Sequence, residues 1–182
     1  MSLPNLISLA RLLAVPVAIY FILSHYYALA FWLFVAAGAS DAIDGYLAKR
    51  FGLTSALGAY LDPLADKALL VGVYVTLGYA GYVPTWLAIL VVFRDVIIVG
   101  GVILLHISAH GVRMKPLIVS KVNTAAQIAL IVLVLGELGL GGQWPLPRMA
   151  MVYLVAVTTL LSGAAYIVEW YRQEARSQGE PP

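Results

Sequence analysis

Six apolar runs, each about as long as a membrane span, take up almost the whole chain. Each run is bounded by glycine, proline or charged residues, so we predict helices over 6–24, 28–49, 55–79, 84–107, 117–138 and 147–171. A bilayer-spanning helix needs about 20 residues, and 182 residues therefore leave no room for a soluble domain beside six spans. The predicted fold class is all-α: a polytopic membrane protein with six transmembrane helices. We expect one domain over residues 1–182, ending in a disordered tail at 171–182.

The composition is typical of a chain that contacts lipid. Hydrophobic residues make up 62% of the chain and charged residues 11%, whereas soluble domains have roughly 45–50% and about 25%. The mean hydropathy is +0.92. The sequence contains no cysteine, which excludes disulfides, thiolate catalysis and zinc–thiolate sites. A formal net charge of +2 is too small to indicate nucleic-acid binding.

Lysine and arginine are distributed unevenly over the predicted loops, and this predicts an orientation. If both termini are cytoplasmic, the cytoplasmic side holds six cations and the other side only Arg148, as the positive-inside rule requires. The six cations are Lys49, Arg50, Arg113, Lys115, Arg172 and Arg176. The first run lacks the basic segment and cleavage site of a signal peptide. With no transit peptide before it, we expect a bacterial inner membrane, with the mitochondrial inner membrane as the alternative.

Five acidic residues lie inside apolar runs, where an ionised aspartate costs about 2.5–3.5 kcal/mol at the bilayer centre. Asp41 and Asp44 are three residues apart, and Asp62 and Asp66 are four apart, so each pair shares one helix face. Both pairs are expected roughly 10–14 Å below the same membrane surface. Because a tight turn joins the two runs, the four carboxylates can converge at one depth. The fifth residue is Asp95.

Four converging carboxylates predict a site for divalent metal ions. Two divalent ions would cancel four negative charges, and all-oxygen ligands favour Mg²⁺, Mn²⁺ or Ca²⁺ over zinc. A two-metal centre suits in-line displacement at a phosphorus atom. Gly45, Ala48 and Gly58 lie beside the carboxylates and leave room for a nucleotide, while Lys49 and Arg50 are placed to meet an anion.

Other interpretations of these acids stay open. They could form buried ion pairs with Lys67, Arg94 and Lys121, although three cations cannot neutralise five acids. They could also line an ion or proton pathway, and the protein would then be an ion or lipid transporter that releases no nucleotide. Arg94 and Asp95 are neighbours in the chain, and adjacent helix residues point apart. We therefore expect each of these two residues to need another partner.

Residues 41–66 read D-AI-D-G-YL-A-K-RFGLTSAL-G-AYL-D-PLA-D. This resembles the signature of the CDP-alcohol phosphatidyltransferases, D-x2-D-G-x2-A-R-x8-G-x3-D-x3-D. The one departure is Lys49, which keeps the charge of the usual arginine but loses its bidentate fork.

The resemblance implies a six-helix membrane enzyme, commonly a homodimer, that transfers a phosphatidyl group from CDP-diacylglycerol to an alcohol and releases CMP. It implies that two divalent ions, Mg²⁺ or Mn²⁺, are held by Asp41, Asp44, Asp62 and Asp66. Asp66 would also act as general base on the acceptor hydroxyl, with a role as metal ligand alone as the alternative. The nucleotide pocket would be lined by Gly45, Ala48, Lys49 and Gly58.

The second half of the chain bears on the acceptor alcohol. FRDVIIVGG at 93–101 and RMKPLIVSKVNTAAQ at 113–127 resemble CMP-forming cardiolipin synthases, whereas PNLISLARLLAVPVA at the start resembles these and phosphatidylglycerophosphate synthases alike. Phosphatidylglycerol is therefore the expected acceptor and glycerol 3-phosphate the alternative, with other alcohols also open. Candidate cations for its phosphate are Arg94, Arg113, Lys115 and Lys121.

The predicted helix over 117–138 has a polar face. Ser120, Asn123, Thr124 and Gln127 recur at helical spacing. The face could line the acceptor site, or it could serve only hydrogen bonds between helices.

Overall fold

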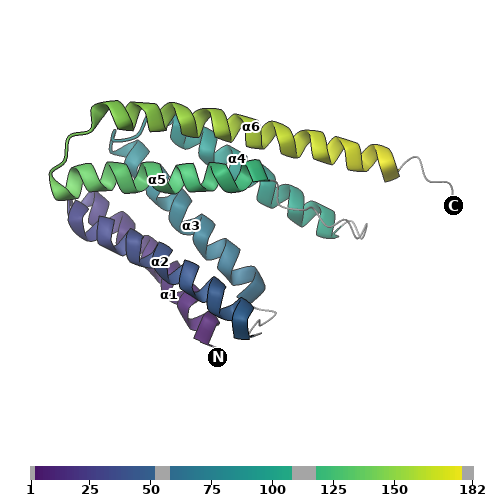
Figure 1. Cartoon of the computed structure of the whole chain (residues 1–182), viewed down its shortest axis with the longest axis horizontal. Coiled ribbons are helices and arrows are strands. Elements are labelled where there is room, and N and C mark those ends of the chain that lie inside the picture. Colours follow the sequence, from purple (N-terminus) through teal and green to yellow (C-terminus); the bar gives the residue numbers. More distant parts are fainter. Residues whose placement is uncertain (1–2, 52–57, 108–117, 178–182) are drawn as a thin grey trace.

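The computed structural model describes the backbone of residues 3–51, 58–107 and 118–177, and the side chains within 8–40, 65–98, 100, 118–169 and 171. Figure 1 shows that these residues form helices and no strand, which confirms the all-α fold class. The six helices are α1 (Leu3–Leu23), α2 (Tyr27–Phe51), α3 (Gly58–Tyr79), α4 (Thr85–Ile107), α5 (Ile118–Leu140) and α6 (Pro145–Ser177).

Helix α6 is longer than predicted at both ends. It begins at Pro145, because proline suits the first turn of a helix, where an N–H would lack a partner anyway. The disordered tail expected at 171–182 is wrong as far as Ser177, because α6 continues to that residue. Arg, Gln, Glu and Ala in this stretch are good helix formers, so the helix persists after the apolar run has ended.

Short turns join α1 to α2, α3 to α4 and α5 to α6, and Figure 1 shows them gathered at one end of the molecule. Each turn contains a residue with left-handed backbone: His25 (φ 63°), Gly81 (φ 79°) and Gly141 (φ 77°). After α3, the N–H of Tyr82 donates to the carbonyl of Leu77 over 2.9 Å. This is the helix-ending motif in which glycine avoids the clash of a Cβ atom.

The core lies where α3 and α5 pass through the middle of the bundle. Val73, Tyr74 and Leu77 of α3 and Leu130 and Val134 of α5 are fully buried. Around them, α1 packs on α2 and α3, while α6 packs on α4 and α5. Helices α2 and α3 are thereby held in one assembly by their neighbours, and these are the two helices that carry the predicted motif.

Two helices pass as membrane spans on length and composition. Among the described residues these are Ile118–Leu140 and Pro145–Glu169, each with a mean hydropathy of 1.9. Soluble monomers rarely expose large apolar patches, yet α6 carries a long row of exposed apolar side chains, including Leu146, Met149, Tyr153, Val157, Leu160 and Leu161. The six helices are confirmed, and the number of membrane spans stays a prediction.

Candidate functional site

The predicted motif falls at the end of α2 and the start of α3. Asp41, Asp44, Gly45, Ala48 and Lys49 belong to α2, and Gly58 and Asp62 belong to the first turns of α3. Their side chains lie outside the described residues, so their convergence stays a prediction. Among the side chains that are described, no group of three or more His, Asp or Glu could hold a metal ion.

Asp66 is described, and its carboxylate is bonded to Arg11 of α1. Nη1 of Arg11 donates to Oδ1 of Asp66. The Arg11 side chain is 4% exposed and that of Asp66 is 42% exposed, so the pair joins a buried cation to an accessible carboxylate. Arg11 was not among the residues predicted for the site. The available signal was a lone cation inside the first apolar run, where a charge needs a partner.

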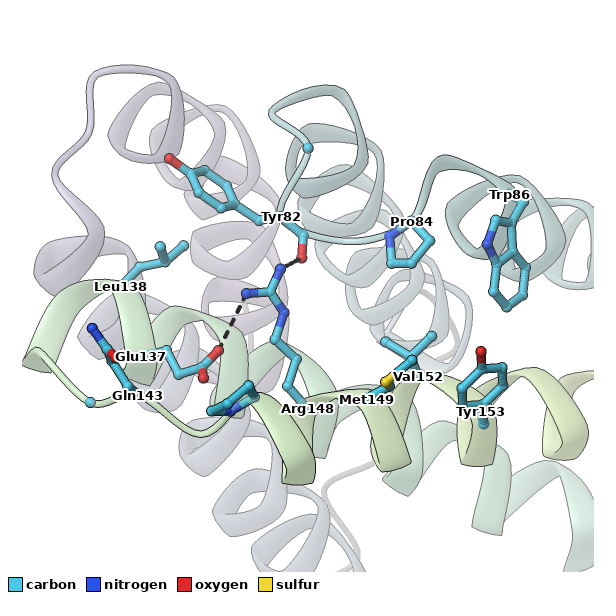
Figure 2. A pocket seen from close by; sticks show the side chains of 13 residues that line it. Tyr82, Pro84, Trp86, Glu137, Leu138, Gln143, Arg148, Met149, Val152 and Tyr153 are labelled. Atoms are coloured by element: carbon cyan, nitrogen blue, oxygen red, sulfur yellow. Dashed lines mark hydrogen bonds and ion pairs between the residues drawn. The ribbon is translucent and has the colours of Figure 1, made fainter.

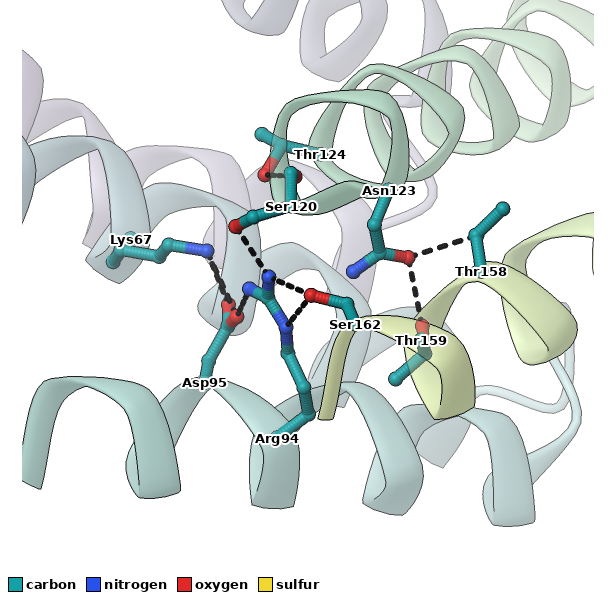
Figure 3. A network of polar contacts seen from close by, with 9 residues as sticks. All are labelled: Lys67, Arg94, Asp95, Ser120, Asn123, Thr124, Thr158, Thr159 and Ser162. Carbon is teal, nitrogen blue, oxygen red and sulfur yellow. Dashed lines mark hydrogen bonds and ion pairs between the residues drawn. The ribbon is translucent and has the colours of Figure 1, made fainter. Parts of the chain in front are cut away.

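Lys67 and Asp95 connect α3 to α4 (Figure 3). Nζ of Lys67 donates to both carboxylate oxygens of Asp95 at 2.8 Å. Asp95 is 4% exposed and Lys67 is 28% exposed. Among the cations considered in the sequence analysis, Lys67 and Arg94 are thus confirmed as ion-pair partners of Asp95, whereas Asp66 pairs with Arg11.

Each of Arg94 and Asp95 has another partner, as expected, and the two neighbours also contact each other directly. Its Nη1 donates to Oδ1 of Asp95 over 2.6 Å. The Cβ atoms of adjacent helix residues point apart, but the arginine side chain is long enough to fold back along the helix to the neighbouring carboxylate. The remaining nitrogens bond to neighbouring helices: Nη2 donates to Ser120 of α5 and Ser162 of α6 at 2.5 Å, and Nε donates to Ser162 at 3.2 Å.

The cations predicted to meet an acceptor phosphate have different surroundings. Arg94 is 4% exposed, with its hydrogen bonds inside the bundle, and its contact with a phosphate stays a prediction. Lys121 is exposed on α5, so the alternative that made it a buried ion-pair partner is wrong. Arg113 and Lys115 lie outside the described residues.

The polar face of α5 packs partly against α6. Oδ1 of Asn123 accepts hydrogen bonds from Thr158 and Thr159, both over 2.9 Å. Hydrogen bonding between helices is thus confirmed for Asn123. Gln127 is fully buried, and neither polar atom of its side chain has a hydrogen-bond partner among the described residues.

A cavity of about 610 Å³ lies at the end of the molecule that holds the short turns (Figure 2). Its wall includes Trp86, Glu137, Arg148 and Tyr153. Arg148 donates to Oε2 of Glu137 over 3.5 Å and to the carbonyl of Tyr82. The α2 and α3 motif belongs to the opposite ends of those helices, so this cavity is separate from the predicted chemistry.

Residues 1–169 match the sequence model of a protein family described as CDP-alcohol phosphatidyltransferase. A rice protein named chloroplastic CDP-diacylglycerol–glycerol-3-phosphate 3-phosphatidyltransferase 1 is 35% identical over 95% of this chain and 58% of its own length. A rat protein named cardiolipin synthase (CMP-forming) is 35% identical over 71% of this chain and 48% of its own. A Cereibacter sphaeroides protein named CDP-diacylglycerol–glycerol-3-phosphate 3-phosphatidyltransferase is 38% identical over 74% of this chain and 64% of its own length. The chain therefore spans about half to under two thirds of these relatives, which carry two different acceptor names.

Proposed function

The chain belongs to the CDP-alcohol phosphatidyltransferase family, and we propose that it is a membrane enzyme that transfers a phosphatidyl group from CDP-diacylglycerol to phosphatidylglycerol, with release of CMP. The family predicted from residues 41–66 is thereby confirmed. The observation that carries the proposal is the motif itself, because its four aspartates stand at the family's spacing within the matched residues.

The acceptor is the finer part of the proposal. The pattern at 113–127 resembles cardiolipin synthases, and cardiolipin synthases from rat and human are among the relatives. Glycerol 3-phosphate is the second candidate, since relatives from rice and Cereibacter sphaeroides carry that acceptor in their names. The two candidates share the donor lipid and the site, and they differ only in the alcohol that attacks.

The donor set suits two divalent ions. Four carboxylates give only oxygen ligands, and the Asp66 side chain, 42% exposed, is accessible to an ion. Asp41, Asp44, Asp62 and Asp66 would hold Mg²⁺ or Mn²⁺. When bound, the ions would stabilise the charge of the pyrophosphate and of the departing CMP.

Asp66 is the proposed general base. A glycerol hydroxyl oxygen of the acceptor attacks the phosphorus that carries the diacylglycerol, the bond from this phosphorus to the oxygen of CMP breaks, and the hydroxyl proton passes to the Asp66 carboxylate. Arg11 holds one oxygen of that carboxylate and so limits its rotation. Gly45, Ala48, Lys49 and Gly58 would receive the nucleotide. We also propose a homodimer with the site opening to the cytoplasmic side of an inner membrane.

Product analysis tests the proposal. Purified protein in detergent is given CDP-diacylglycerol and Mg²⁺ or Mn²⁺, with phosphatidylglycerol or glycerol 3-phosphate in separate reactions, and products are identified by mass spectrometry. We expect cardiolipin and CMP with phosphatidylglycerol only, and no product in the presence of EDTA. If phosphatidylglycerophosphate is the only product, the acceptor is glycerol 3-phosphate and the proposed phosphatidylglycerol is wrong. If no CMP is released with either acceptor, the result counts against an enzyme and favours a transporter.

Two carboxylate variants sharpen this test. Asp66→Asn keeps the size of the side chain but removes the base, so we expect CMP release to fall by at least about 100-fold. Glu137→Gln makes the same change beside the cavity at the far end of the bundle, and its rate should match that of the unmodified chain. Equal rates for the two variants would contradict the role of Asp66.

A further inference from the structure

Lys67 presents an ammonium group that is anchored on one side. It follows Asp66 directly on α3, and two hydrogen bonds of 2.8 Å attach its Nζ to the Asp95 carboxylate. An ammonium has three protons, and no third acceptor contacts Nζ among the described residues. Asp95 of α4 therefore holds the ammonium group, and 28% of the Lys67 side chain stays exposed.

Among the described residues, two cations and one carboxylate meet around Lys67. Lys67 and Arg94 are two cations that share the single carboxylate of Asp95, which gives a net charge of +1. The other partners of Arg94 in the network, Ser120 and Ser162, are neutral. An ammonium that one carboxylate anchors and that stays partly exposed can also contact an anionic ligand.

We propose that Lys67 binds a phosphate group of a lipid substrate and that Asp95 and Arg94 are positioning residues for its ammonium. The inference rests on the proposed function, because it assigns the anion to a substrate of the same site. Lysine binds phosphate as a point charge. Arg94 is the less suitable contact: it is 4% exposed, and each of its three nitrogens already donates within the bundle.

Steady-state kinetics of variants test the proposal. Lys67→Met keeps the length of the side chain but removes the charge, and a charged hydrogen bond is worth about 10- to 100-fold in affinity. We expect the KM of one phosphate lipid to rise by that factor, while Lys67→Arg stays within a few-fold of the unmodified chain. Asp95→Asn should raise the same KM with kcat nearly unchanged, a separation that a purely structural defect would not give. Arg148→Gln, which removes a cation at the far end, serves as the control.

The arms of the experiment separate the two sources of phosphate. A rise in the KM for phosphatidylglycerol assigns the contact to the acceptor, and a rise in the KM for CDP-diacylglycerol assigns it to the donor. An unchanged KM for both lipids in a folded Lys67→Met protein overturns the proposal. Absence of CMP release from the unmodified chain would instead overturn the proposed function, so the two failures are distinguishable.

A second measurement needs no variant. An amine-acylating reagent modifies Lys67 of the intact chain, and mass spectrometry gives the rate. We expect CDP-diacylglycerol or phosphatidylglycerol to slow this modification several-fold, whereas diacylglycerol, which lacks a phosphate, leaves the rate unchanged. Equal rates with all three lipids would overturn the proposal even if Lys67→Met failed to fold.

Discussion

Replacing Asp95 with asparagine removes the negative charge that Lys67 and Arg94 share. The native network has a net charge of +1, and Asp95→Asn raises it to +2. Arg94→Gln lowers it to zero and leaves the Lys67–Asp95 pair intact. The double variant returns to +1. The two single changes therefore differ in sign, although each deletes one charge from the same ion pair.

The loss in the free energy of unfolding expected for each variant follows from how deeply the affected side chains are buried. Removing one partner of a buried ion pair costs about 3–5 kcal/mol. Lys67 is 28% exposed and retains some hydration, so we expect the lower end, about 3 kcal/mol, for Asp95→Asn. Arg94→Gln loses hydrogen bonds to two serines, which cost about 1–2 kcal/mol. Because the double variant restores the net charge of +1, its loss in the free energy of unfolding should be about 1–2 kcal/mol smaller than the sum of the losses of the two single variants.

The free energy of unfolding can be measured by titrating the protein in mixed micelles with sodium dodecyl sulfate and following far-ultraviolet circular dichroism. Glu137→Gln is the control, because its partner Arg148 is 32% exposed and such pairs contribute about 1 kcal/mol or less. An Asp95→Asn loss no larger than that of Arg94→Gln, or strict additivity in the double variant, would refute the charge argument.

Two further predictions concern the packing of α5. A Cβ atom at Gly139 would lie 2.7 Å from the backbone of Ala28, so Gly139→Ala should lower stability by about 1–3 kcal/mol. Gly163→Ala, with no atom within 4 Å, should raise it by about 0.5–1 kcal/mol in the same sodium dodecyl sulfate titration. Equal changes in the two variants would argue against the close approach at Gly139. Gln127→Met should leave stability unchanged or raise it by up to about 2 kcal/mol, because the polar atoms of Gln127 have no partner among the described residues. Asn123→Leu loses two hydrogen bonds and should lower the free energy of unfolding by about 1–3 kcal/mol. If Gln127→Met is the less stable of these two variants, the result contradicts these contacts.

The helices were largely predictable because each coincides with an apolar run that ends at glycine, proline or charge. The exception is the end of α6, where hydropathy carries no information about a helix that has left the apolar run. Helix propensity in that stretch would have given the better prediction.

The contacts around the candidate site were less predictable than the motif. Motif spacing made Asp66 a candidate, but its partner Arg11 is 55 positions away in the chain. Which faces of α1 and α3 meet depends on packing, and a single sequence does not contain this directly. The contact between Arg94 and Asp95 stayed one alternative among others, because Cβ geometry does not account for a side chain long enough to bend around the helix.

The short turns also determine where the molecule can deform. Each one fixes the separation of the two helix ends that it joins. With 23 residues, α5 is about 34 Å long. A tilt of about 5° at its turn therefore moves its far end by about 3 Å, a lever motion that leaves the turn itself in place. A tilt about the short turns therefore displaces helix atoms most at the end opposite the turns, which is the end of α2 and α3 that carries the motif residues.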